Sequence, residues 1–181
     1  MITYGNRPQP RILVAGIGNI FMGDDAFGVR VAQRLAECSL PEDVHVADFG
    51  IRGLDLAYAL MDEYELTIFV DTTQRGGTPG TLYVIEPDLN DLQITGDAQC
   101  MLDAHAMDPV KVLRMAMYLG ARLRRILLVG CEPGDCGSAT EGLMGLTEPV
   151  ESALEGAVQI VNKLITQFLT PSQSQRSEPR A

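Results

Sequence analysis

Residues 11–25, RILVAGIGNIFMGDD, decide the fold expected for this chain. Within them, the run Arg11–Gly18 is apolar after its first residue and ends in glycine, a pattern typical of a β-strand buried on both faces. Residues Ala26–Glu37 follow with apolar side chains at helical spacing, which predicts an amphipathic helix. A buried strand that leads into a helix is the opening of a parallel βαβ unit.

Strand and helix patterns keep alternating along the rest of the chain. Further strands are expected at 44–49, 66–70, 81–85 and 125–130, and further helices at 53–61, 109–119 and 149–169. This alternation predicts an α/β fold of three layers, with a mostly parallel sheet and helices on both faces. No helix separates the third strand from the fourth. The fourth is therefore expected to be an antiparallel edge strand or to pair with the third through a hairpin.

Length and end composition predict one domain. A chain of 181 residues is long enough for a single domain with its own core. We assign that domain to residues 11–169, with a flexible arm at 1–10 and a disordered polar tail at 170–181. Neither end carries enough apolar surface to offset the entropy lost on ordering. We expect a monomer.

Charge and cysteine content narrow the class of partner and the compartment. The net charge is −10, from 24 acidic and 14 basic residues, and an acidic surface repels phosphate backbones, which argues against nucleic acid. The four cysteines, Cys38, Cys100, Cys131 and Cys136, form no CxxC pair, so free thiols in a reducing cytoplasm are expected. The apolar run Ile12–Ile17 is too short to span a membrane, and no signal peptide is visible.

Asp25, Asp71 and His105 are the candidate site residues. Each is expected where a strand gives way to a loop or a helix, and ligands of such folds bind beyond the carboxyl ends of the strands. Two carboxylates and an imidazole suit nickel, zinc, manganese or iron. The chain has only two histidines, and the other, His45, lies inside an apolar strand pattern.

Simpler interpretations of these residues stay open. Asp24 or Asp25 could cap the following helix, and Asp71 could be a turn residue. The glycines at 16 and 18 resemble a dinucleotide-binding loop, but Phe21 stands where that motif needs its third glycine.

A serine or cysteine nucleophile is a weaker hypothesis. Ser138 lacks the GxSxG elbow of many hydrolases. Cys131 follows the fifth expected strand and could pair with His105 as a thiolate. A small buried side chain at a strand end is the simpler interpretation of Cys131.

Six separated motifs resemble those of the hydrogenase maturation endopeptidases. They are GIGNIFMGDDAFGVRVAQRL, DFGIRGLDL, IFVDTTQRGGTPGTLYV, DAHAMDPVKVL, LVGCEP and GLTEPVESAL, in the family's order between about Arg11 and Leu169. The resemblance implies a twisted five-stranded sheet between helices. It also implies an endopeptidase that removes the C-terminal extension of a [NiFe]-hydrogenase large-subunit precursor after nickel insertion.

The resemblance implies functions for individual residues as well. Asp25, Asp71 and His105 match the family's nickel-binding residues and are the candidates for any direct catalytic role. The nickel is expected to arrive with the precursor, and zinc or cadmium is expected to substitute in vitro. The segment around Gly50 matches a loop near the family's cleft, although Phe49 stands where a second glycine is frequent.

Two other functions stay open from the sequence. One is a nickel-binding or hydrogenase-assembly chaperone that does not cleave its client. The other is a nucleotide-binding enzyme. The absence of an HExxH motif separates the chain from standard zincins.

Overall fold

The computed structural model describes residues 11–91, 108–137 and 142–170. Its strands are β1 (Ile12–Ile17), β2 (Val44–Gly50), β3 (Leu66–Thr72), β4 (Leu82–Ile85) and β5 (Arg125–Cys131). Its α-helices are α1 (Phe27–Ala36), α2 (Gly53–Ala59), α3 (Pro109–Tyr118) and α4 (Glu148–Leu169). Three short 3₁₀ helices, η1 (Gly23–Ala26), η2 (Leu60–Asp62) and η3 (Leu89–Asp91), complete the described elements. None of the described helices has the length and apolar character needed to cross a membrane.

The five strands form one sheet in the order β2-β1-β3-β5-β4. The pairs β1–β2, β1–β3 and β3–β5 are parallel. At the edge of the sheet, β4 pairs with β5 in antiparallel register. The predicted α/β fold and the antiparallel edge strand are therefore confirmed. The hairpin alternative is wrong, because β4 pairs with β5 and not with its predecessor β3.

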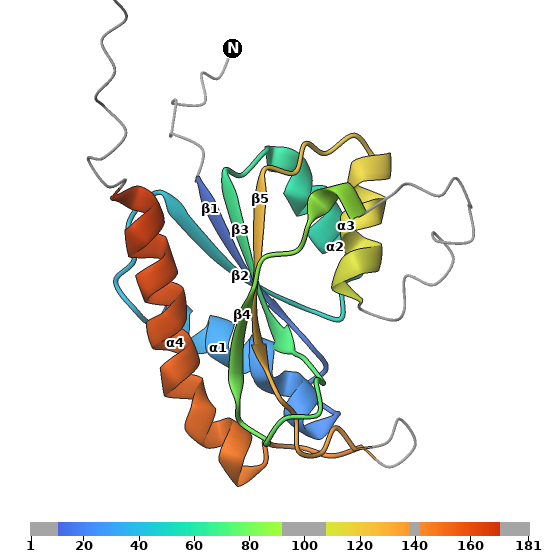
Figure 1. Ribbon diagram of the computed structural model, residues 1–181, viewed down its shortest axis with the longest axis vertical. Helices are drawn as coiled ribbons and strands as arrows, with labels where there is room; N and C mark the ends of the chain where they lie inside the picture. The colour runs from blue at the N-terminus through green and yellow to red at the C-terminus, as the bar shows by residue number, and fades with distance from the viewer. Residues whose placement is uncertain (1–10, 92–107, 138–141, 171–181) are drawn as a thin grey trace, which may run out of the picture.

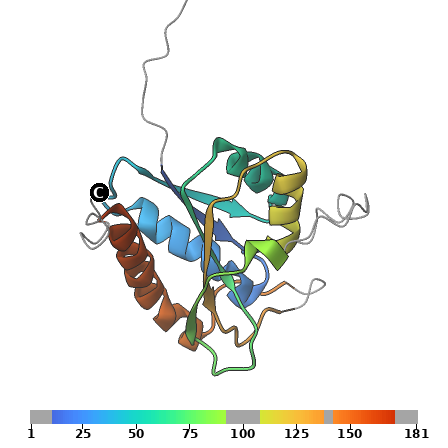
Figure 2. The same ribbon diagram turned by 45° about the horizontal axis from the view of Figure 1, so that its top comes forward.

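Helices cover the sheet on both faces (Figures 1 and 2). α1 and α4 pack together on one face, where the core includes Val14, Val70 and Val129. α2 and α3 pack on the other, where the core includes Leu13 and Phe69. Adjacent strand residues belong to opposite cores because side chains alternate along a strand.

β1 and β3 define the point where the direction of winding changes. The chain leaves β1 through α1 to reach β2 on one side, then crosses through α2 to β3 on the other side of β1. In open α/β sheets such a switch point leaves a crevice beyond the carboxyl ends of the two strands. The loops after β1, β3 and β5 gather at this edge, at the lower end of the sheet in Figure 1.

Two element boundaries differ from the prediction in ways that affect the site. The first predicted helix begins as η1, so Asp24 and Asp25 lie in a 3₁₀ turn before α1. The third strand was predicted to stop before Asp71, but it continues to Thr72 because Asp71 and Thr72 pair with Gly130 and Cys131 of β5. The predicted arm at 1–10 and the end of the predicted tail, 171–181, lie outside the described residues, so the domain limits stay a prediction.

Candidate functional site

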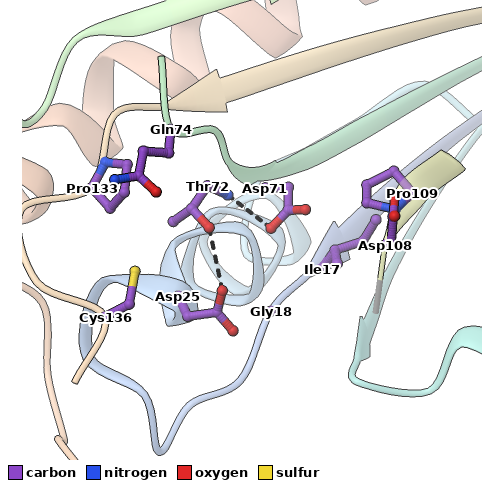
Figure 3. Close-up of a pocket in the computed structure, with 10 residues that line it drawn as sticks. All are labelled: Ile17, Gly18, Asp25, Asp71, Thr72, Gln74, Asp108, Pro109, Pro133 and Cys136. Carbon is purple, nitrogen blue, oxygen red and sulfur yellow. Dashed lines mark hydrogen bonds between the residues drawn. The ribbon is translucent and has the colours of Figure 1, made fainter. Parts of the chain in front are cut away.

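A pocket of about 700 Å³ opens at the switch point (Figure 3). It is formed by the end of β1, by η1, by the end of β3, by the start of α3 and by the loop after β5. Its lining residues are Ile17, Gly18, Asp25, Asp71, Thr72, Gln74, Asp108, Pro109, Pro133 and Cys136. Three of the ten are aspartates, so the pocket is acidic.

Asp25 is half-buried, and both of its carboxylate oxygens have partners. Oδ2 accepts a hydrogen bond of 2.7 Å from the backbone amide of Asn19. Oδ1 accepts one of 3.3 Å from the hydroxyl of Thr72. No side-chain capping hydrogen bond is made at the start of η1 or of α1. The capping interpretation of Asp25 is therefore wrong, and its carboxylate belongs to the pocket.

Asp71 is a buried carboxyl group with a raised pKa. Only 8% of the residue is exposed, and its Oδ1 accepts a hydrogen bond of 2.8 Å from the backbone amide of Thr72. Burial, with help from the negative charges of Asp25 and Asp108, raises the pKa of Asp71 to about 7. Within the described ranges no ion pair includes Asp25 or Asp71.

Asp24 has a structural role that differs from that of its neighbour. It is fully buried, and it accepts hydrogen bonds from the backbone amides of Gly134, Asp135 and Thr147 and from the Thr147 hydroxyl. Burial would raise the pKa of Asp24, but these hydrogen bonds to the ionised form outweigh burial and lower it. Asp24 therefore joins η1 to the loop after β5 and to the start of α4.

Glu132, like Asp24, is a carboxylate with a structural role, and it binds the loop after β3. Its side chain accepts hydrogen bonds from the backbone amides of Arg75 and Gly76 and from the Tyr83 hydroxyl, at 2.8 to 3.0 Å. Glu132 thereby ties this loop, which carries Gln74 into the pocket wall, to β4 and β5. These hydrogen bonds hold in place the loop that carries Gln74.

Two other residues that the sequence singles out, His45 and Cys131, do not line the pocket. His45 is exposed on β2, and its Nδ1 lies 3.1 Å from the Tyr64 hydroxyl. Cys131 is fully buried at the end of β5, and burial raises the pKa of its thiol to about 12, which leaves it a poor nucleophile. His105 and Ser138 lie outside the described residues.

The loop after β1 is not built to bind phosphate. Its Asn19 amide, the kind of donor that a phosphate would need, already binds the Asp25 carboxylate. The Gly18 amide donates to the carbonyl oxygen of Gly50, at 3.0 Å. Gly50 and its neighbours therefore lie beside the pocket margin, next to Gly18.

Several residues that line the pocket were not predicted from the sequence. Asp108 is the N-cap of α3, since its side chain accepts a 2.9 Å hydrogen bond from the Val110 amide. The dipeptide Asp108-Pro109 was a usable signal, because aspartate at the N-cap and proline at the first helical position mark a helix start. Thr72, Gln74 and Cys136 gave no such signal, since only tertiary structure brings their segments to the pocket.

The described part of the pocket does not by itself form a complete metal site. Across residues 11–91, 108–137 and 142–170, no group of three His, Cys, Asp or Glu side chains is arranged to hold a metal ion. Asp25 and Asp71 supply two oxygen donors that suit a divalent cation. Any ion bound there needs further ligands from elsewhere.

Fold and pocket together define an α/β protein with a carboxylate-lined site at the switch point of its sheet. Comparison with known proteins specifies that class. The family model for hydrogenase maturation protease matches residues 29–164. The hydrogenase expression/formation protein HupD of Rhizobium leguminosarum bv. viciae is 34% identical over 162 residues, which are 87% of this chain and 77% of that protein. The hydrogenase 2 maturation protease of Escherichia coli (strain K12) is 30% identical, over 83% of this chain and 88% of that protein.

Solved structures of similar proteins point to the same family. The hydrogenase 2 maturation peptidase from Thaumarchaeota archaeon SCGC_AB-539-E09 aligns with a TM-score of 0.65 and 34% identity, over 86% of this chain and 98% of that one. The hydrogenase maturating endopeptidase HybD from E. coli aligns with a TM-score of 0.67 and 27% identity, over 87% and 93% of the two chains. This chain belongs to the hydrogenase maturation protease family and is a peptidase.

Proposed function

We propose that this peptidase removes the C-terminal extension of a [NiFe]-hydrogenase large-subunit precursor after nickel has been inserted. The observation that carries the proposal is the pairing of Asp25 and Asp71 in one acidic pocket at the switch point. Family membership supports the peptidase activity. The two carboxylates support recognition of a cation within the substrate.

Nickel is in this proposal a part of the substrate, carried by the precursor, and not a resident cofactor. Asp25 and Asp71 would each offer oxygen ligands, and His105 would add an imidazole. Asp108, which lines the pocket, follows His105 by three residues.

An open set of two carboxylates and one imidazole binds nickel weakly when alone. A precursor that provides thiolates would complete the coordination, and the shared ion would add binding energy that a nickel-free precursor lacks. The protease would then distinguish loaded from unloaded precursor by a difference in affinity. We therefore expect the isolated protein to purify largely without nickel.

The decisive experiment compares two matched precursors, one loaded with nickel and one without, in a buffer that contains a chelator. Mass spectrometry of the products should show cleavage of the loaded precursor only. Equal cleavage of both would refute metal-gated recognition and leave the peptidase activity standing. Stable binding of the loaded precursor without cleavage would instead favour a chaperone.

His105→Ala tests the ligand that the described residues do not supply. If the imidazole completes the nickel site, this variant should fold normally and leave the loaded precursor intact. Wild-type cleavage rates in the His105→Ala protein would remove His105 from the proposal while leaving Asp25 and Asp71 in it.

A further inference from the structure

Thr72 contacts both carboxylates of the pocket. Its hydroxyl donates to Oδ1 of Asp25 at 3.3 Å, and its backbone amide donates to Oδ1 of Asp71 at 2.8 Å. Both contacts are drawn as dashed lines in Figure 3, one from Thr72 to each aspartate. Asp25 and Thr72 are 47 positions apart in the sequence, so this hydrogen bond links η1 to the end of β3.

The alternation of β3 places its last two side chains on opposite sides of the sheet. Val70 belongs to the core under α1 and α4, and Phe69 belongs to the core under α2 and α3. Thr72 shares the parity of Val70, and Asp71 shares that of Phe69. Thr72 therefore reaches Asp25 from the α1 side, while Asp71 faces the side where α3 begins with Asp108.

Thr72 links the two carboxylates without adding a charge of its own. They carry like charges, and the negative charge of Asp25 contributes to the raised pKa of Asp71. Among the described residues neither aspartate has an ion-pair partner. A threonine supplies two donors, one from the side chain and one from the backbone, and adds no charge that would compete with a cation.

We propose that Thr72 is a positioning residue that fixes the Asp25 carboxylate beside Asp71 for binding the nickel of the precursor. This inference rests on the proposed function. Without the hydroxyl, the hydrogen bond that Asp25 keeps among the described residues is the one from the Asn19 amide. The carboxylate can then rotate away from Asp71, and the pocket loses the fixed spacing of its two oxygen ligands.

The test compares Thr72→Val, which has nearly the same shape and no hydroxyl, with Thr72→Ser, which restores the hydroxyl. For the nickel-loaded precursor, the valine variant should lose roughly tenfold in kcat/KM through a higher KM, as expected for one hydrogen bond to a charged group. The serine variant should recover most of that loss. Affinity for the nickel-free precursor should not change in either variant.

Thr73→Val is the matched control. Thr73 is the next residue, and its buried Oγ1 has no hydrogen-bond partner in the part of the chain that the structure describes. Replacing that hydroxyl removes no contact of the pocket, so kcat/KM should stay within about twofold of the wild type. A crystal structure of Thr72→Val provides a readout independent of activity and should show the Asp25 carboxylate displaced.

The outcomes separate this inference from the proposed function. Wild-type protein that cleaves no precursor overturns the proposed function. Normal wild-type cleavage with unchanged kcat/KM and an unmoved Asp25 in Thr72→Val overturns the inference alone. Equal losses of activity in Thr72→Val and Thr73→Val would also overturn it, because a general packing defect would then explain both.

Discussion

The Asp24 carboxylate accepts hydrogen bonds from both the backbone amide of Thr147, at 2.6 Å, and its hydroxyl, at 2.9 Å. Thr147 is the N-cap residue of α4, but its side chain makes no cap hydrogen bond within its own helix. The α4 start is instead attached to η1, 123 residues away in the sequence. One buried carboxylate thus joins α4 to η1, the 3₁₀ helix that also carries Asp25.

Replacing Asp24 should cost far more stability than replacing its neighbour. In Asp24→Asn the amide NH₂ would face backbone N–H groups that now donate to a carboxylate, so we expect a loss of about 3 kcal/mol in the free energy of unfolding. Asp25→Asn replaces a half-buried carboxylate that accepts two hydrogen bonds and should cost about 1 kcal/mol or less. Denaturant unfolding of both variants measures the difference, and equal losses would contradict the structural assignment of Asp24.

The same carboxylate should make the protein sensitive to acid. The pKa of Asp24 is lower in the folded state than in the unfolded state, so its contribution to stability is present above the unfolded pKa of about 4. That contribution is lost as the pH falls through the folded pKa. The melting temperature should therefore fall more steeply between pH 6 and pH 3 for the wild type than for Asp24→Asn.

The contribution of Asp71 to stability depends on pH in the opposite direction to that of Asp24. The pKa of Asp71 in the folded state, about 7, lies above the ordinary aspartate value of 3.8. Any stability it contributes is therefore present below pH 4 and is lost as the pH rises through 7. Asp71→Asn should raise the free energy of unfolding at pH 8 by roughly 1–3 kcal/mol. It should have little effect on stability at pH 4, and it should abolish precursor processing.

Thermal melts of wild type and Asp71→Asn across pH 4–9, with a processing assay at pH 8, check both parts of this prediction. A variant that is more stable and inactive would show that the folded state tolerates an unfavourable buried charge for function. Full processing by the folded Asp71→Asn protein would remove Asp71 from the site.

The fold was predictable because its signals are local. β1 is apolar along its whole length and is buried at every residue, so the sequence pattern and the burial coincide. The strand order was not predictable, because which strand pairs with β3 depends on how α2 and α3 pack against the sheet. The extension of β3 to Thr72 was missed for the same reason, since its cause is pairing with β5.

The site was predictable only in part. Asp25 and Asp71 follow from the rule that ligands bind beyond the carboxyl ends of parallel strands. The separate function of Asp24 was not visible, because its partners come from segments 110 or more positions away. Thr72 was hidden for a related reason, since an ordinary threonine at a strand end becomes informative only when η1 is placed beside it.

The cysteines should be dispensable for processing. Burial raises the pKa of the Cys131 thiol to about 12, and burial together with four nearby aspartates raises that of Cys136. Both thiols therefore stay protonated at neutral pH and are poor nucleophiles. Single substitutions Cys38→Ser, Cys100→Ser, Cys131→Ala and Cys136→Ser should each leave measurable cleavage of the precursor. Complete loss in a folded Cys131→Ala protein would revive the thiol-protease hypothesis.

Gly18 should be irreplaceable because η1 passes directly against it. Its φ is +133°, and a Cβ added there would lie 1.7 Å from the backbone carbonyl oxygen of Asp25. Gly18→Ala therefore carries both backbone strain and a collision that can be relieved only by moving η1 and the Asp25 carboxylate with it. Gly120→Ala is the matched control, since Gly120 has a φ of +100° and a Cβ there would meet no atom within 4 Å.

Strain alone costs about 1–2 kcal/mol, so Gly120→Ala should lower the melting temperature modestly and keep full processing activity. Gly18→Ala should lower it further, and the folded fraction should cleave the nickel-loaded precursor poorly because Asp25 has moved from Thr72. Melting curves and processing rates, each corrected for the folded fraction, separate strain from displacement. Identical behaviour of the two variants would show that the approach of η1 to Gly18 does not position the site.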